Sequence, residues 1–348
     1  MKVEKLEWLK KITAKQIVSM CILMVAIYFI APLTTNDSGE KTNLVGSMGY
    51  SYEEEVSVMG KSVYVMHEEM GYMVKTVVAI DEELSDVENV FNSIKQGSAV
   101  LQEGVDGLVP ASAVIRDYTI DNKILTLNLS ESFLYYRNSI ETDLLTSIVW
   151  SMTEIPGIER VHFNIEGTPV NNLNTNIDVG RGLTRNMGIN LEIGDARMTN
   201  AQMVTLYFFT NDSEDPLLIP VSRLVSNEVD PFVHAVSSLV RGPVGAGYIS
   251  VFNHQTTLLE QPKLENGILT LNFCSELFFD QDQTQVSSLV IKQLVMTLTE
   301  FEEVMEVSIV IEGSSRVFDD AGNPITVPVG RNIILNWENR YDRFVEES

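Results

Sequence analysis

Cysteine is nearly absent from this sequence, whose 348 residues include only Cys21 and Cys274. Disulfide frameworks and structural zinc sites need several cysteines at short spacings. Cys21 lies in a long apolar run and Cys274 in a segment that alternates like a strand, so we do not expect the two to pair. Unpaired cysteine is among the most buried residue types. We therefore interpret Cys274 as a small packed side chain rather than as a nucleophile.

Histidine is almost as scarce, with His67, His162, His234 and His254 as the whole supply. None has a second histidine or cysteine two to four residues away, a common spacing of metal ligands. The sequence also lacks Walker, Rossmann and G-x-S-x-G patterns. We therefore predict a protein that is not an enzyme, with no catalytic residue, no cofactor, no metal site and no small-molecule substrate. Its binding residues are left unassigned.

Two oxygen-rich segments, Phe279–Thr284 and Asp319–Pro324, keep calcium open as an alternative. Both resemble calcium loops, but neither has the spaced ligands and the terminal glutamate of a known loop. Aspartate and asparagine are also the usual residues of turns and helix caps. We interpret both segments as turns or caps.

Basic residues are half as frequent as acidic ones, 24 against 48, which gives a formal net charge of −24. Recognition of nucleic-acid phosphates needs clustered lysine and arginine, so the charge excludes that class of partner. Anionic lipid and wall polymers are disfavoured for the same reason. A basic protein surface is the natural complement of this charge.

The N-terminus has the opposite balance. Residues 1–33 hold five lysines and two glutamates, and end in an uncharged run, QIVSMCILMVAIYFIAPL. A helix of this length just spans a thin hydrocarbon core. The run lacks the small-residue cleavage site of a signal peptide. Most of its apolar residues follow Cys21, whereas a lipoprotein needs the apolar stretch to precede its cysteine. We predict a cytoplasmic basic tail over residues 1–16, an uncleaved single-pass anchor in the cell membrane over 17–33, and an extracytoplasmic remainder.

The pentapeptide ILTLN occurs twice, at Ile124–Asn128 and at Ile268–Asn272. Its leucines alternate with polar residues, which predicts a strand with one buried face. A second block recurs downstream at an offset of about 146, Met152–Gly167 against Leu298–Gly313. Thr-Glu stands near the start of both copies, and both copies end in Ile-Glu-Gly. The shared order of the blocks indicates a duplication.

A third block, Val-Gly-Arg, recurs at residues 179–181 and 329–331, at an offset of about 150. Matched blocks whose offset grows slowly indicate tandem domains with small insertions. We predict a linker over residues 34–60, a first domain over 61–195 and a second over 200–340. The two ILTLN strands should be equivalent.

Each copy has the same predicted order of strands and helices. Ser85 and Glu88 form a capping box at a helix in the first copy, while Pro231 begins and Gly242 ends the corresponding helix of the second. Asn266-Gly267 predicts a tight hairpin turn before the second ILTLN. The predicted fold class is α+β, a small mixed or antiparallel sheet with two helices on one face, made twice.

The segment TEIPGIERVHFNIEG (Thr153–Gly167) and its second copy TEFEEVMEVSIVIEG resemble the GerMN domain, as do LVRGP (Leu239–Pro243) and VPASAVI (Val109–Ile115). The resemblance covers roughly residues 60–340. It implies a scaffold or assembly factor of sporulation or spore germination that binds envelope or sporulation proteins. A peptidoglycan-associated accessory protein, or a weak wall-active enzyme, is the alternative.

Overall fold

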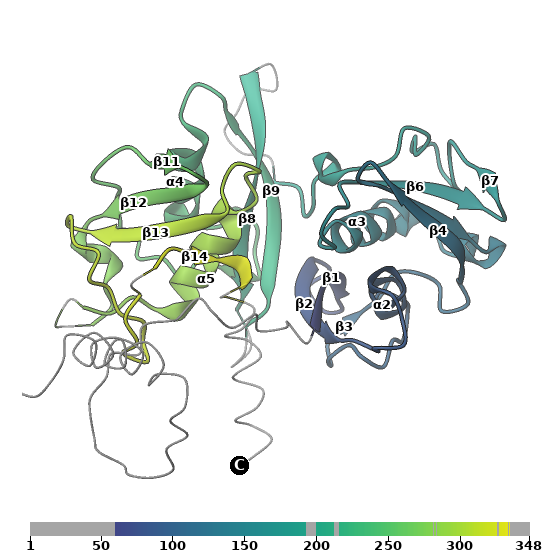
Figure 1. Cartoon of the computed structure of the whole chain (residues 1–348), viewed down its shortest axis with the longest axis horizontal. Coiled ribbons are helices and arrows are strands. Elements are labelled where there is room, and N and C mark those ends of the chain that lie inside the picture. Colours follow the sequence, from purple (N-terminus) through teal and green to yellow (C-terminus); the bar gives the residue numbers. More distant parts are fainter. Residues whose placement is uncertain are drawn as a thin grey trace, which may run out of the picture. The chain divides into compact units, whose positions relative to one another are not determined.

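The computed structural model describes residues 60–334 apart from 193–199, 212–215, 281, 283, 326 and 333 (Figure 1). The predicted basic tail, membrane anchor and all but the last residue of the linker lie outside the described residues. Within those residues, the structure contains no helix whose length and apolar character would let it cross a membrane.

The first repeat runs from β1 to the short helix η5. Its elements are β1 (Gly60–His67), β2 (Met73–Ala79), α2 (Asp86–Ser93), β3 (Val105–Asp106), β4 (Ile115–Asp121), β5 (Ile124–Leu129), η3 (Glu131–Leu134), η4 (Asn138–Ile140), α3 (Glu141–Met152), β6 (Arg160–Ile165), β7 (Thr168–Pro169) and η5 (Arg185–Met187).

The second repeat follows the same order. Its elements are β8 (Ala201–Thr210), β9 (Leu218–Ser226), α4 (Pro231–Arg241), β10 (Tyr248–Ile249), β11 (Lys263–Glu265), β12 (Ile268–Phe273), η7 (Ser275–Leu277), α5 (Ser288–Leu298), β13 (Glu306–Ile311) and β14 (Val329–Gly330). Both repeats belong to one compact unit of the chain.

The first helix of each repeat begins and ends at the predicted signals. Ser85 caps α2 by accepting a hydrogen bond from the Glu88 backbone, and the Glu88 carboxylate accepts one from the Ser85 backbone. Pro231 opens α4, and Gly242 ends it with a φ of 87°. These local signals are confirmed because each satisfies backbone groups at its own helix end.

The ILTLN segments are equivalent strands, as predicted. Each is the second strand of a four-stranded mixed sheet, β4-β5-β6-β7 or β11-β12-β13-β14. Each pairs antiparallel with the strand before it and parallel with the strand that ends in Ile-Glu. The hairpin loops are Asn122-Lys123 and Asn266-Gly267, with positive φ at all four residues, which confirms the predicted turn.

The prediction of one small sheet per domain with both helices on one face is wrong. Each repeat also contributes a hairpin, β1-β2 or β8-β9, to one shared six-stranded sheet of order β10-β8-β9-β2-β1-β3. In the first repeat, α3 contacts both β1 and β6 and so lies between two sheets (Figure 1). The physical reason is that α3 is buried around almost its whole circumference, and such a helix needs cover on both sides.

The two hairpins meet at only one backbone pair, Lys75 with Leu218. Pro220 lies in β9 two residues farther on, and it has no N–H to continue the ladder. The Asn190 amide takes over instead, because it donates to the carbonyls of Met73 and Pro220 and accepts from the Met73 N–H at 2.7–2.9 Å. The segment between the repeats therefore joins the shared sheet.

The third block of the predicted repeat is aligned wrongly. In the second repeat, Val329 of β14 pairs with Val307 of β13. The residue that pairs with the equivalent strand of the first repeat is Leu183, which bridges Val161. Both pairs keep the offset of 146 found for the preceding block.

This pairing makes Arg185, and not Arg181, the counterpart of Arg331. The chain from Ile-Glu-Gly to this arginine has the same length in both repeats, so no insertion separates them. The match at residues 179–181 is a coincidence of three common residues.

Candidate functional site

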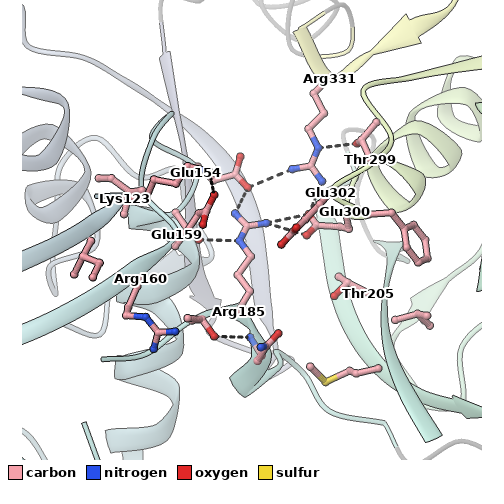
Figure 2. A pocket seen from close by; sticks show the side chains of 18 of the residues that line it. Lys123, Glu154, Glu159, Arg160, Arg185, Thr205, Thr299, Glu300, Glu302 and Arg331 are labelled. Atoms are coloured by element: carbon pink, nitrogen blue, oxygen red, sulfur yellow. Dashed lines mark hydrogen bonds and ion pairs between the residues drawn. The ribbon is translucent and has the colours of Figure 1, made fainter. Parts of the chain in front are cut away.

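Two glutamates and two arginines, one of each from either repeat, meet between the repeats (Figure 2). Arg185 Nη2 lies 2.5 Å from Glu154 Oε1, and Arg331 Nη2 makes the equivalent bond to Glu300. Each arginine also reaches across: Arg185 Nη1 lies 3.0 Å from both oxygens of Glu300, and Arg331 Nη1 lies 3.5 Å from Glu154. The four side chains form one ionic cluster, in which each arginine touches both glutamates.

The helix ends position these side chains. Thr153-Glu154 follows α3 directly, and Thr299-Glu300 follows α5. Nε of each arginine donates to the threonine hydroxyl of its own repeat, at 2.8 and 2.7 Å, and Nη2 donates to a carbonyl in the last helical turn. Cations are favoured at helix C-termini, where carbonyls lack intrahelical partners. The repeated Thr-Glu motif therefore binds the arginine of its own repeat.

Two tyrosines and one lysine complete the ionic cluster. The Tyr64 hydroxyl donates to Glu154 and the Tyr207 hydroxyl to Glu300, both at 2.8 Å, and the two hydroxyl oxygens lie 2.8 Å apart. Lys75 Nζ lies 2.8 Å from Glu154 and its residue is only 5% exposed. The tyrosines are equivalent in the two repeats, whereas the lysine comes from the first repeat alone.

Mutual neutralisation fixes the charges of the cluster. Burial alone would raise the pKa of Glu154, but Lys75, Arg185 and Arg331 outweigh it and hold that pKa well below the usual range. In the same way the two arginines lower the pKa of Glu300 to about 2 against the effect of burial. Burial and the neighbouring carboxylates raise the pKa of both tyrosines, which stay protonated. No carboxylate or phenol of the cluster exchanges a proton near neutral pH, as general acid–base catalysis requires.

An open cleft of about 760 Å³ lies over the ionic cluster. Its charged lining is balanced, with four cations and four carboxylates: Lys123, Arg160, Arg185, Arg331, Glu154, Glu159, Glu300 and Glu302. At its rim, Lys123 Nζ lies 2.5 Å from Glu159 Oε1, and Arg160 donates to the carbonyls of Arg181 and Gly182. Thus most of the charged side chains that line the cleft already have partners within the protein.

The histidines and Cys274 do not line this cleft. They lie on five separate elements or loops: His67 at the end of β1, His162 on β6, His234 on α4, His254 after β10 and Cys274 after β12. Cys274 is buried, and its sulfur accepts a hydrogen bond from the Thr257 N–H at 3.1 Å. Ser130 fills the equivalent position in the first repeat and accepts from Val114 N. Both side chains therefore accept a hydrogen bond from a backbone N–H group.

In the two segments that the sequence predicted as turns or caps, an aspartate side chain accepts hydrogen bonds from nearby backbone N–H groups. Asp280 accepts from the N–H groups of Thr284 and Gln285, and Asp319 accepts from those of Ala321 and Asn323. No group of three or more histidine, cysteine, aspartate or glutamate side chains within the described ranges has the arrangement of a metal site. Both aspartates act as turn residues in this structure.

Sequence reasoning missed the ionic cluster although one signal for it was present. The duplicated Thr-Glu marks the two carboxylates, but the misaligned third block hid their arginine partners. Tyr64 and Tyr207 stand in the opening strand of either repeat, and nothing in their local sequence distinguishes them from core tyrosines.

Comparisons with known proteins agree with the duplicated fold. The family described as "Germane: Sporulation and spore germination" matches residues 62–171 and 205–317, once in each repeat. The spore germination protein GerM of Bacillus subtilis (strain 168) is 26% identical over 245 residues, which cover 69% of this chain and 67% of that protein. The solved tandem GerMN domains of the B. subtilis sporulation protein GerM superpose with a TM-score of 0.71 at 25% identity, covering 78% of this chain and 97% of that one.

Proposed function

The chain belongs to the Germane family of sporulation and spore germination proteins, and we propose that it acts there as a membrane-anchored, extracytoplasmic scaffold or assembly factor. In this proposal the soluble part binds other proteins and catalyses no reaction. The B. subtilis relative, whose name assigns it to spore germination, supports the setting.

The observation that carries the proposal is that the side chains of the ionic cluster are bonded to one another. It is the largest group of buried and partly buried charges that we find among the described residues, and each of its carboxylates is held by two arginines and a tyrosine. A catalytic acid, base or nucleophile needs a titrating or reactive group that faces a substrate. These side chains instead tie one repeat to the other.

Such a link suits a protein that presents surfaces at a fixed separation. The two repeats are joined by the ionic cluster, by the Lys75–Leu218 backbone pair and by the Asn190 amide. Preorganised surfaces lose less conformational entropy on binding than surfaces on a flexible tether. The strongly acidic composition points to partners with basic surfaces among envelope or sporulation proteins, with steering that weakens as salt rises.

The test is complementation of a spore-forming strain that lacks this gene. One variant replaces His67, His162, His234, His254 and Cys274 together, with glutamine for the histidines and serine for the cysteine. A scaffold keeps full spore yield and germination in this variant. A matched variant with the same export and folding, but with its surface acidic residues replaced by amides, should lose function.

Loss of function in the first variant, with normal export and thermal unfolding, would contradict the proposal and favour a reaction at one of the five positions. Digestion of purified peptidoglycan by the purified full-length wild-type protein would favour the wall-active alternative.

A further inference from the structure

The sheets of the described residues end in edge strands of very unequal length. Five of the six edges are two or three residues long: β3, β7, β10, β11 and β14. The sixth, β4, has seven residues and forms one edge of the first repeat's mixed sheet. Short edge strands protect a sheet from pairing with other chains. That protection is missing at β4.

The free backbone groups of β4 can be assigned from its hairpin. The loop Asn122-Lys123 has two residues, so Asp121 and Ile124 exchange backbone hydrogen bonds, and alternate residues of β4 do the same. Asp121, Thr119 and Asp117 therefore bond to β5. The N–H and C=O groups of Tyr118 and Ile120 point away from the sheet.

The apolar face of this sheet continues to the open edge. Ile120 is paired with Leu125, so both side chains lie on the face that carries the core. Leu125 is fully buried, whereas Ile120 remains 49% exposed. One further strand beside β4 would bond to the free backbone groups and cover this side chain.

In the second repeat the equivalent sheet edge is blocked against an added strand. At the offset of 144 that relates the two ILTLN segments, the counterpart of Tyr118 is Pro262. Proline has no N–H, so it removes a donor at the position where an added strand would need one. β11 begins only after this proline and has three residues. The chain thus blocks one of two equivalent edges and leaves the other open.

We propose that β4 is a docking edge at which an extended, basic segment of a partner protein adds as a further strand. This inference rests on the proposed protein-binding function and names the edge and the chemistry of the partner. Main-chain hydrogen bonds supply affinity in such strand addition, and side chains at alternate positions supply specificity.

Two carboxylates make the edge selective for basic side chains. Asp117 and Asp121 lie on the face of β4 opposite to the core, on either side of Thr119. Asp117 accepts from the Asn128 amide and Asp121 from the Asn122 amide, and in the described part of the chain neither pairs with a cation. Lysine or arginine at alternate positions of an added strand would face both.

The same carboxylates disfavour a second copy of this chain. Two β4 strands paired antiparallel about Thr119, the centre of the regular stretch 117–121 that follows the bulge between Ile115 and Asp117, would place Asp117 opposite Asp121 in both halves. Like charges directly opposite each other destabilise a strand pair. The net charge of −24 on each chain adds to the repulsion.

The experiment uses the full-length protein and three synthetic peptides that alternate valine with lysine, valine with glutamate, or valine with lysine on N-methylated backbone amides. Binding is measured by titration, and hydrogen exchange of residues 115–121 is followed by mass spectrometry. We expect the unmodified basic peptide to bind and to slow exchange in this segment. The acidic and the N-methylated peptides should do neither.

Tyr118→Pro and Tyr118→Val form a matched pair of variants. Y118P removes the outward N–H, and Pro262 at the equivalent position shows that the fold accepts proline there. Y118V keeps the N–H. We expect Y118P to bind the basic peptide at least about tenfold more weakly than Y118V, while both unfold at similar temperatures.

Absence of binding by the basic peptide, equal binding of the N-methylated peptide, or equal affinity of the two variants would each overturn the inference. Complementation separates it from the proposed function. If the Y118P protein restores spore yield as well as Y118V does, β4 is not the docking edge, although protein binding elsewhere still stands.

Discussion

Asn128 in the first repeat and Asn272 in the second make the same contact, because each side-chain oxygen accepts a hydrogen bond from the glycine of Ile-Glu-Gly. The glutamates of that motif, Glu166 and Glu312, each accept a hydrogen bond from the first backbone N–H of the short helix that follows ILTLN, η3 or η7. At these shared positions the side chains therefore hold the chain's own backbone, whereas the shared glutamates and arginines of the ionic cluster join one repeat to the other.

Two differences between the repeats concern residues that face the partner repeat or the solvent. Lys75 of the first repeat enters the ionic cluster, whereas the strand position opposite Tyr207 in the second repeat is Pro220. Tyr118 leaves a sheet edge open, whereas Pro262 closes its counterpart. Residues that agree between the copies therefore maintain the fold, and residues that differ give the two repeats different roles.

The largest expected difference between the repeats follows from removing the carboxylate that pairs with Lys75. Glu154→Gln leaves Lys75 buried with no carboxylate, whereas Glu300→Gln leaves each arginine with Glu154. We expect E154Q to lower the free energy of unfolding by about 3–5 kcal/mol, and E300Q by less, because an unpaired buried charge is costly. Urea unfolding of the full-length protein measures both.

The matched control for this prediction is Glu159→Gln, which breaks an exposed pair with Lys123. The Glu159 side chain is 63% exposed, so the loss should stay below about 1 kcal/mol. A loss in E154Q no larger than that in E159Q would mean that the ionic cluster does not stabilise the fold.

The sequence predicted the local features of the fold, but it did not predict the contacts between residues far apart in the chain. The Ser85–Glu88 capping box and the Asn266-Gly267 turn were predictable because each satisfies backbone groups within a few residues. The shared sheet was not, because no local pattern distinguishes a hairpin that pairs within its own domain from one that pairs with its neighbour. The equivalence of the ILTLN strands needed only the repeat itself.

The ionic cluster needed information that the sequence holds only weakly. Arg185 and Glu300 lie 115 residues apart, and their contact depends on how the two repeats pack. A three-residue match at 179–181 competed with the correct alignment of Arg185 to Arg331, and only strand pairing decided between them. The open edge of β4 could not be predicted either, because the position of a strand at a sheet edge follows from the order of the strands in the sheet.

The contribution of Glu300 to stability should depend on pH. The folded-state pKa of Glu300 is lowered to about 2, and its usual value is 4.5. A lowered carboxyl pKa contributes stability that is complete above the usual value and is lost as pH falls toward the folded value. The wild type should therefore lose about 3 kcal/mol relative to E300Q between pH 4.5 and pH 2. Urea midpoints of both proteins across that window measure it, and parallel curves would contradict it.

The smallest expected difference lies between the two equivalent asparagines. Asn128 accepts from the Gly167 N–H at 2.7 Å and donates to Asp117 at 2.7 Å, whereas Asn272 makes the corresponding bonds to Gly313 and Glu260 at 3.1 and 3.3 Å. Asn128 is also the more buried of the two.

A hydrogen bond lost from a buried group costs more than one that water can replace. We therefore expect Asn128→Ala to lower the free energy of unfolding by about 2 kcal/mol and Asn272→Ala by about 1 kcal/mol. Both variants remove the same atoms from the same position of the motif, so each is the control for the other in urea unfolding. An equal or larger loss in N272A would show that the closer contacts and deeper burial of the first repeat do not set the strength of this shared contact.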